Sequence, residues 1–151
     1  MQITHSELIS KASKWLKRHT ENSFIPNCSF ILTEFVAITN TGETPDILGF
    51  SSCRSVMIEV KVNRSDFLND KNKMFRNYED FGMGQQKFYC CPEGLIKENE
   101  IPDGWGLLYW TGKKIEIKKN GNMQECNLKA ERTMLLSIIR RLKEQLNAFK
   151  F

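Results

Sequence analysis

Two carboxylates and a lysine stand at a spacing that suits metal-dependent chemistry. Asp46 is followed, after twelve intervening residues, by Glu59-Val60-Lys61 within the largely apolar stretch 55–62. Side chains two positions apart on a strand point to the same face, so Glu59 and Lys61 share a surface if this stretch is a strand. If the strand that carries Asp46 lies beside it, Asp46 and Glu59 converge on one cation, and the Val60 carbonyl could add a ligand.

Such a site has the parts that phosphodiester hydrolysis needs. Hard oxygen ligands suit Mg²⁺ or Mn²⁺, and a bound metal polarises the phosphate, helps to form hydroxide and neutralises charge on the phosphoryl oxygens. Lys61 would orient the attacking water and stabilise the transition state. The structural alternative is that Glu59 and Lys61 pair with each other or with Arg64 at a sheet edge.

The first half of the chain predicts helices and strands in alternation. Apolar residues recur at helical spacing over residues 4–19, and residues 28–38 and 45–50 have the composition of two strands joined as a hairpin. The apolar stretch 55–62 predicts a central, buried strand. A second helix is expected over residues 65–78, because Ser65 can cap it.

The second half predicts further strands and a long C-terminal helix. Residues 86–91 and 105–110 are typical of strands, and residues 113–118 and 123–126 of a small hairpin at a sheet edge. Apolar residues at three- and four-residue spacing over residues 128–149 predict a helix that covers one sheet face. We therefore expect an α/β fold with a mixed central β-sheet flanked by α-helices.

Length and composition favour one domain, residues 1–151, in the cytoplasm. No apolar run approaches the roughly 20 residues of a membrane helix, and the N-terminal residues do not resemble a secretion signal. The five cysteines form no CxxC pair, which argues against a disulfide framework and a zinc site. A net charge of +4 favours a polyanionic partner only modestly.

The motifs and their order resemble a known family. Pro45-Asp46 followed by Glu59-Val60-Lys61, between two helices, is similar to the PD-(D/E)xK nuclease superfamily, whose members share the restriction-endonuclease-like fold. This resemblance covers about residues 1–91 and implies that Asp46 and Glu59 are metal ligands and Lys61 the catalytic lysine. Four stretches also look similar to small bacterial and phage proteins of this superfamily described as DNA-repair proteins: residues 59–67, 82–84, 91–95 and 104–107.

The resemblance implies two further site residues. Many members bring an acid from the first helix or first strand, for which Glu7 and Glu34 are the candidates here. We favour Glu34, because an acid in an otherwise apolar strand needs an explanation, whereas Glu7 in a first helical turn is explained by the helix dipole. Some members place a Gln or Lys on the strand after the second helix, where this chain has Gln86 and Lys87. We take Lys87.

Basic residues beside the second helix are candidates for nucleic-acid binding. Arg64, Lys73 and Arg76, together with Lys87, could contact phosphates near the cut site and give salt-dependent, sequence-independent affinity. The alternative is a solvated charged face in which residues such as Asp70 form intrahelical pairs.

The expected function is Mg²⁺-dependent hydrolysis of DNA, structure-selective or non-specific, in DNA repair, recombination or phage DNA metabolism. One alternative is a nucleic-acid- or protein-binding module that keeps the fold without turnover. Another is a phage-encoded inhibitor of a host protein. A homodimer is plausible because many nucleases of this fold cut two strands as dimers. The residues leave open whether the substrate is DNA or RNA, and whether it is single-stranded, duplex or branched.

Overall fold

Six strands form one mixed β-sheet in the order β1-β2-β3-β4-β5-β6. The structure, a computed structural model, describes residues 2–20 and 24–146. Its strands are β1 (Phe30–Thr33), β2 (Ile47–Phe50), β3 (Ser55–Val60), β4 (Gln86–Pro92), β5 (Gly106–Trp110) and β6 (Ile115–Lys119), and its α-helices are α1 (His5–Arg18), α2 (Arg64–Asp70), α3 (Met74–Asn77) and α4 (Leu128–Leu146). The α/β class and the mixed sheet are as predicted.

The predicted hairpin and central strand are confirmed. β1, β2 and β3 pair antiparallel, whereas β3, β4 and β5 run parallel and are joined by crossovers, the first of which contains α2 and α3. Every residue of β3 is buried. A strand covered on both faces needs apolar side chains on both, which is why this stretch is an almost unbroken run of β-forming residues.

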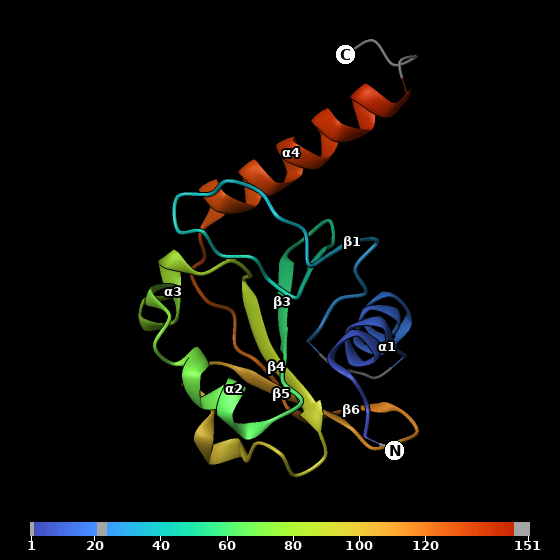
Figure 1. The fold of residues 1–151 in the computed structure, drawn as a ribbon, viewed down its shortest axis with the longest axis vertical. Helices are drawn as coiled ribbons and strands as arrows, with labels where there is room; N and C mark the ends of the chain where they lie inside the picture. Colours follow the sequence, from blue (N-terminus) through green and yellow to red (C-terminus); the bar gives the residue numbers. More distant parts are fainter. Residues whose placement is uncertain (1, 21–23, 147–151) are drawn as a thin grey trace.

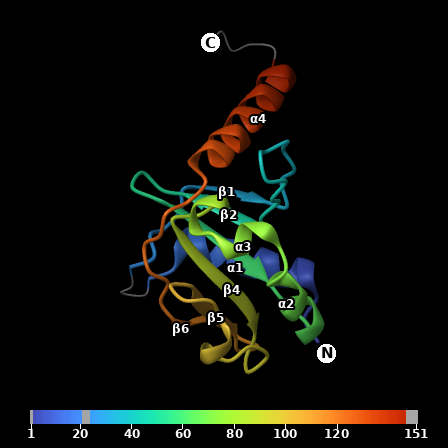
Figure 2. The ribbon, with the colours of Figure 1, turned by 90° about the vertical axis from the view of Figure 1, so that its left-hand side faces the viewer.

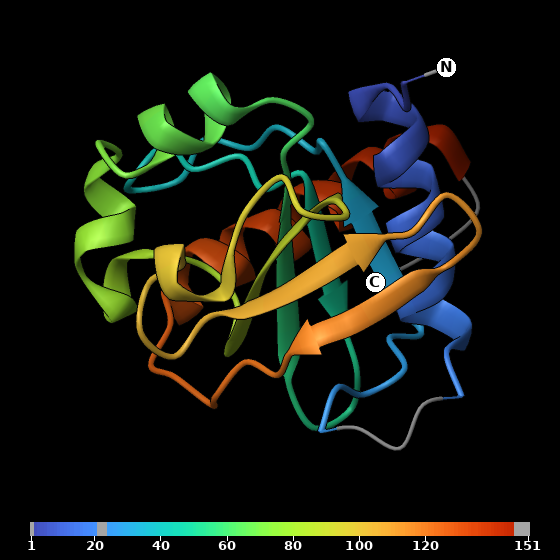
Figure 3. The ribbon, with the colours of Figure 1, turned by 90° about the horizontal axis from the view of Figure 1, so that it is seen from below.

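The helices cover opposite faces of the sheet. Figure 3 shows α1 on one side of the strands and α2 and α3 on the other. Alternation along β3 sends Ile58 into the core that α1 covers, while Met57 joins the core on the side of α2. Glu59 therefore faces the same side as Met57 and α2.

The second helix is interrupted, which differs from the single helix predicted over residues 65–78. α2 ends at Asp70, and α3 begins at Met74. The Asp70 side chain is fully buried, and the Asp70 carbonyl accepts the N–H of Lys73 in the turn between the helices. The break coincides with this buried carboxylate, at a point where tertiary contacts can override local helix propensity.

Two predictions for the C-terminal part are wrong. Residues 123–126 form no strand, because Gln124 donates its N–H to Gln85 and the segment runs past the sheet, while β6 pairs with β5 instead. The α4 helix does not cover a sheet face along its whole length. Its first half packs through Ala130, Glu131, Met134 and the partly buried Ile138, and Arg141 lies over the Phe35 ring at 4.3 Å. The C-terminal end of the helix extends away from the body in Figures 1 and 2.

Glu131 anchors the start of α4. Its carboxylate is buried and accepts hydrogen bonds from the Ser55 hydroxyl at 2.7 Å and from the Gly84 N–H at 2.8 Å. These bonds attach α4 to the first residue of β3. Within residues 2–20 and 24–146, no helix has the length and hydropathy needed to cross a membrane.

Candidate functional site

Asp46 lies where the β2–β3 ladder ends. Ile47 pairs with Ile58, so the preceding residue, Asp46, falls opposite Glu59, as the spacing predicted. The Val60 N–H donates to Asp46 Oδ2 at 2.8 Å. The carboxylate thus takes the place of a backbone acceptor at the end of the ladder. The Val60 carbonyl stays a predicted metal ligand.

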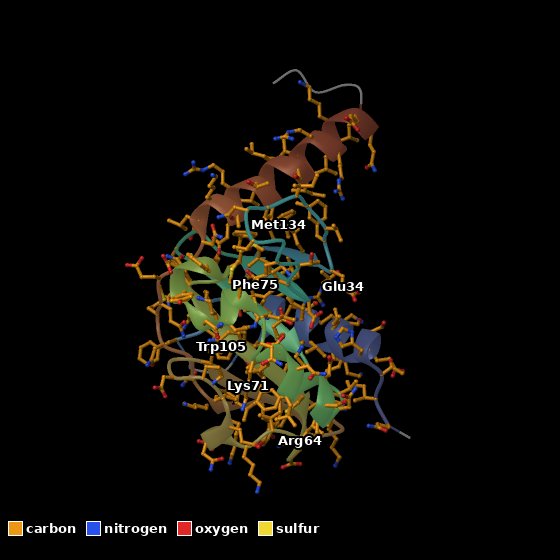
Figure 4. The ribbon with its side chains drawn as sticks, turned by 60° about the vertical axis from the view of Figure 1, so that its left-hand side comes forward. Glu34, Arg64, Lys71, Phe75, Trp105 and Met134 are labelled. Atoms are coloured by element: carbon orange, nitrogen blue, oxygen red, sulfur yellow. The ribbon has the colours of Figure 1, made fainter. Side chains whose placement is uncertain are left out.

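Two side chains from other elements meet Asp46 on its open side. His5, the first residue of α1, places Nε2 3.4 Å from Asp46 Oδ2, and its Nδ1 lies 4.0 Å from Glu34 Oε1. One ligand atom from each of the three residues lies within 4.8 Å of the others, and the described residues hold no other group of this kind. In Figure 4 Glu34 lies beside α1, well separated from Arg64 and Lys71.

The structure separates the two acids that sequence analysis considered. Glu34 follows β1, and its N–H donates to the Asp46 carbonyl at 2.9 Å, which holds the two residues side by side. Glu7 instead accepts the N–H and hydroxyl of Thr4 in the capping box of α1. Glu34 therefore reaches Asp46, and Glu7 serves the helix end.

Glu59 is buried on the other side of Asp46. Only 3% of its surface is exposed, Arg76 Nη2 lies 2.9 Å from its Oε1, and Lys61 Nζ lies 3.7 Å from its Oε2. Burial raises the pKa of Glu59, while the Arg76 guanidinium opposes that rise and the Asp46 carboxylate adds to it. Glu59 thus contacts cationic side chains and has little contact with water.

Asp70 forms an ion pair with Lys61, the candidate catalytic lysine. Its fully buried carboxylate lies 3.3 Å from Lys61 Nζ, 2.8 Å from Lys73 Nζ and 2.8 Å from Arg76 Nε, and it accepts the Tyr89 hydroxyl. Burial by itself would raise the pKa of Asp70, but the Arg76 charge and the hydrogen bonds from its partners outweigh burial and lower that pKa. Lys61 is therefore fixed between two buried carboxylates.

Arg76 joins the buried carboxylates and does not face solvent. Its Nη1 donates to Glu43 at 2.9 Å, and the guanidinium lies over the rings of Phe75 and Trp105, with the centroids at 4.8 and 5.1 Å. Figure 4 shows these two rings in the same part of the molecule. The side chain is 3% exposed. The prediction that Arg76 contacts phosphate is therefore wrong, because its guanidinium is buried and forms ion pairs with Glu43, Glu59 and Asp70.

Lys87 requires the same correction. It is 2% exposed and donates to the Glu125 carbonyl at 3.1 Å, so it does not reach a phosphate on the surface. Arg64 and Lys73 remain half exposed, but each has an acidic partner. Arg64 forms a two-pronged pair with Glu100 at 2.6 and 2.8 Å, and hydrogen bonds from Arg64 lower the pKa of Glu100 to about 2.

Ion pairs join three buried carboxylates to three cationic side chains, of which Lys73 is half exposed. The members of this buried network are Glu43, Glu59, Asp70, Lys61, Lys73 and Arg76. Each carboxylate of this set therefore has at least one cationic partner inside the protein. The open group of His5, Glu34 and Asp46 has two carboxylates and one imidazole, which is a donor set that suits a divalent cation.

Several site residues escaped the sequence analysis. His5 belongs to no motif, and Glu43 lies in a polar loop, so neither carried a signal. Asp70 was considered only as part of an intrahelical pair, whereas its ion pair with Lys73 spans the break between α2 and α3. Tyr89 is the residue that could have been found, because it pairs in register with Glu59 on the neighbouring parallel strand.

Comparisons with known proteins show the arrangement of the elements and no activity. No family model and no curated protein matches this chain. A solved structure, the SPO1766 protein of unknown function from Silicibacter pomeroyi, is similar over 100% of this chain and 99% of that one, with a TM-score of 0.65 and 17% sequence identity. At this identity the likeness concerns the fold alone.

Proposed function

We propose that this chain is a metal-dependent nuclease that hydrolyses phosphodiester bonds in DNA, with a PD-(D/E)xK active site on a restriction-endonuclease-like core. The observation that carries the proposal is the juxtaposition of Asp46, Glu59 and Lys61 where the start of β2 meets the end of β3. The order of α1, the antiparallel β1–β3 strands and the parallel β4 supports the proposed core.

Each residue of the motif has a role that follows from its surroundings. Asp46 is the more exposed of the two carboxylates, at 16% against 4% for Glu59, and would hold the cation, which would supply charge neutralisation at the phosphate and activation of water. Lys61 keeps its ammonium group at a fixed position, because Glu59 and Asp70 both hold it. A positive group fixed in advance stabilises developing phosphoryl charge without a cost of reorganisation during the reaction.

A nucleic-acid substrate is supported by charge, although fewer cations are available than the sequence suggested. The chain carries a net charge of +4, and Arg64 and Lys73 keep about half of their side-chain surface exposed, at 45% each. Contacts of this kind are made to the phosphate backbone and confer no sequence preference. The proposed action is therefore structure-selective or non-specific.

A binding module without turnover is the second candidate, and one observation favours it. Glu59 and Lys61 are 3% and 4% exposed and already paired inside the protein, an arrangement that a purely structural network would also show. Such a module would bind DNA equally well in EDTA and would cleave no substrate with any divalent cation.

The deciding experiment is cleavage of labelled single-stranded, duplex and branched DNA in Mg²⁺, Mn²⁺ or EDTA. Wild type should cut at least one substrate in a metal-dependent manner, and Asp46→Asn should abolish cutting. Glu116→Gln is the matched control, since Glu116 is an exposed carboxylate on β6 whose partner is Lys114. Cleavage that persists in Asp46→Asn would refute the proposed site.

A further inference from the structure

We propose that the cation is held on the open side of Asp46, by His5, Glu34 and Asp46, and that this site prefers Mn²⁺ or a similar transition-series divalent ion to Mg²⁺. The inference rests on the proposed function in that Asp46 is the shared ligand. It differs in assigning the remaining ligands, because it places an imidazole and Glu34 on the metal and leaves Glu59 to the buried network.

His5 is held in place by the start of α1. Thr4 caps the helix through the Glu7 N–H, and Glu7 returns the contact to Thr4, so the first turn is fixed. Leu8 and Ala12 bury the helix against the sheet with no exposed surface. The imidazole of His5 is directed from this rigid base at Asp46 and Glu34.

The two carboxylates are fixed by the backbone. Glu34 has a φ of 48°, which is the left-handed conformation that costs energy for a residue with a side chain. Its N–H bond to the Asp46 carbonyl extends the β1–β2 pairing by one residue beyond Thr33 and Ile47. The side chain of Glu34 is 57% exposed, so a cation here is open to water and to a phosphate.

Charge argues against the buried side as the location of the cation. A divalent ion bound by Glu59 would have to replace or approach the Arg76 guanidinium, 2.9 Å from the same carboxylate. Two positive groups that share one buried carboxylate repel strongly. On the open side, two carboxylates face one imidazole, and a divalent ion completes the group without displacing a buried partner.

The imidazole determines the kind of metal. Mg²⁺ prefers oxygen ligands and keeps much of its water, whereas imidazole nitrogen suits transition-series ions. A site of one imidazole and two carboxylates combines both kinds of donor and leaves coordination positions for water and a phosphate oxygen. It therefore fits Mn²⁺ better than Mg²⁺.

The test is direct Mn²⁺ binding, measured by electron paramagnetic resonance and calorimetry on the full chain at a single pH. Wild type should bind one Mn²⁺, with Mg²⁺ competing only at higher concentration. His5→Gln and Glu34→Gln should each weaken Mn²⁺ binding about tenfold or more, the scale on which metal-site contacts act. Asp66→Asn, an exposed carboxylate in the first turn of α2, is the control and should bind as wild type does.

Glu59→Gln distinguishes the two locations, with its thermal melting curve checked first to show that it folds. Mn²⁺ affinity within about threefold of wild type supports the open site, whereas loss of binding in Glu59→Gln with retention in His5→Gln overturns it. Absence of Mn²⁺ binding to wild type at millimolar concentration also overturns it. Metal-dependent cleavage that survives His5→Gln would leave the nuclease standing and refute this site. Mn²⁺ binding that depends on His5, without cleavage of any substrate, would support this site and refute the nuclease.

Discussion

Asp70 contributes to stability out of proportion to its size, because four side chains converge on one buried carboxylate. We expect Asp70→Asn to lower the free energy of unfolding by about 3–5 kcal/mol, as when one partner of a buried ion pair is removed. Urea denaturation measures the change. Asp66→Asn, four residues earlier and exposed, should stay within about 0.5 kcal/mol of wild type. Equal stability of the two variants would contradict the network.

The same residue should make stability fall in acid. The pKa of Asp70 is lowered in the folded protein, where the Arg76 charge and the hydrogen bonds to the carboxylate outweigh burial. A carboxyl group whose pKa is lowered in the folded state stabilises that state at pH values above its ordinary pKa of 3.8. This stabilisation is lost as the pH falls below that value. The free energy of unfolding of wild type should therefore fall more steeply between pH 4 and pH 2 than that of Asp70→Asn. Parallel pH profiles would exclude this role for Asp70.

At the residue scale, the sequence predicted those site residues whose positions follow from neighbouring strands. Asp46 and Glu59 lie opposite each other because a hairpin brings β2 against β3, and Lys61 follows from alternation. His5, Asp70 and Arg76 could not be placed in this way, since each reaches the site from a helix whose position depends on tertiary packing. Arg76 was expected at the surface because its spacing in the chain carries no sign of burial.

Among the helices and strands, too, some could be predicted from the sequence and others could not. β3 was predictable from its β-branched run and its length, and α1 from its periodicity. The break between α2 and α3 was not, because it coincides with a tertiary contact, the buried carboxylate of Asp70. Residues 123–126 resemble a strand in composition, but their backbone groups bond to loops such as that of Gln85. Local patterns predict an element, and distant contacts decide where it ends.

A homodimer stays a prediction, and the exposed side of α4 is where we expect two copies of the chain to pair. Its heptad positions 128, 132, 135, 139, 142 and 146 carry four leucines, one isoleucine and one arginine at alternating spacings of four and three. Leu142, Ile139 and Leu146 are exposed on a helix that extends from the body. The spacing puts Ile139 at an a position and leucines at the three d positions 128, 135 and 142, and isoleucine at a with leucine at d favours two-stranded pairing. We propose that α4 forms a homodimer.

Light scattering after size exclusion tests this pairing. Wild type should shift toward a dimer as concentration rises, and Ile139→Lys combined with Leu142→Lys should be monomeric, because both side chains are exposed and lie on the seam. Glu144→Lys adds a lysine off the seam and should leave the dimer in place. A wild-type monomer at every concentration would show that this face does not pair with itself.

At the scale of the whole molecule, a cation bound only by the folded chain must stabilise that chain. His5, Glu34 and Asp46 come from α1, from the end of β1 and from the start of β2, so unfolding destroys the proposed site. At 100 times its dissociation constant, Mn²⁺ should add about 2.7 kcal/mol to the free energy of unfolding. For a domain of 151 residues that is a rise in Tm of about 5–10 °C. EDTA should reverse the rise in Tm. In His5→Gln the same rise should require an Mn²⁺ concentration about tenfold higher than in wild type. An equal rise in wild type and His5→Gln would mean that the stabilising ion is bound elsewhere.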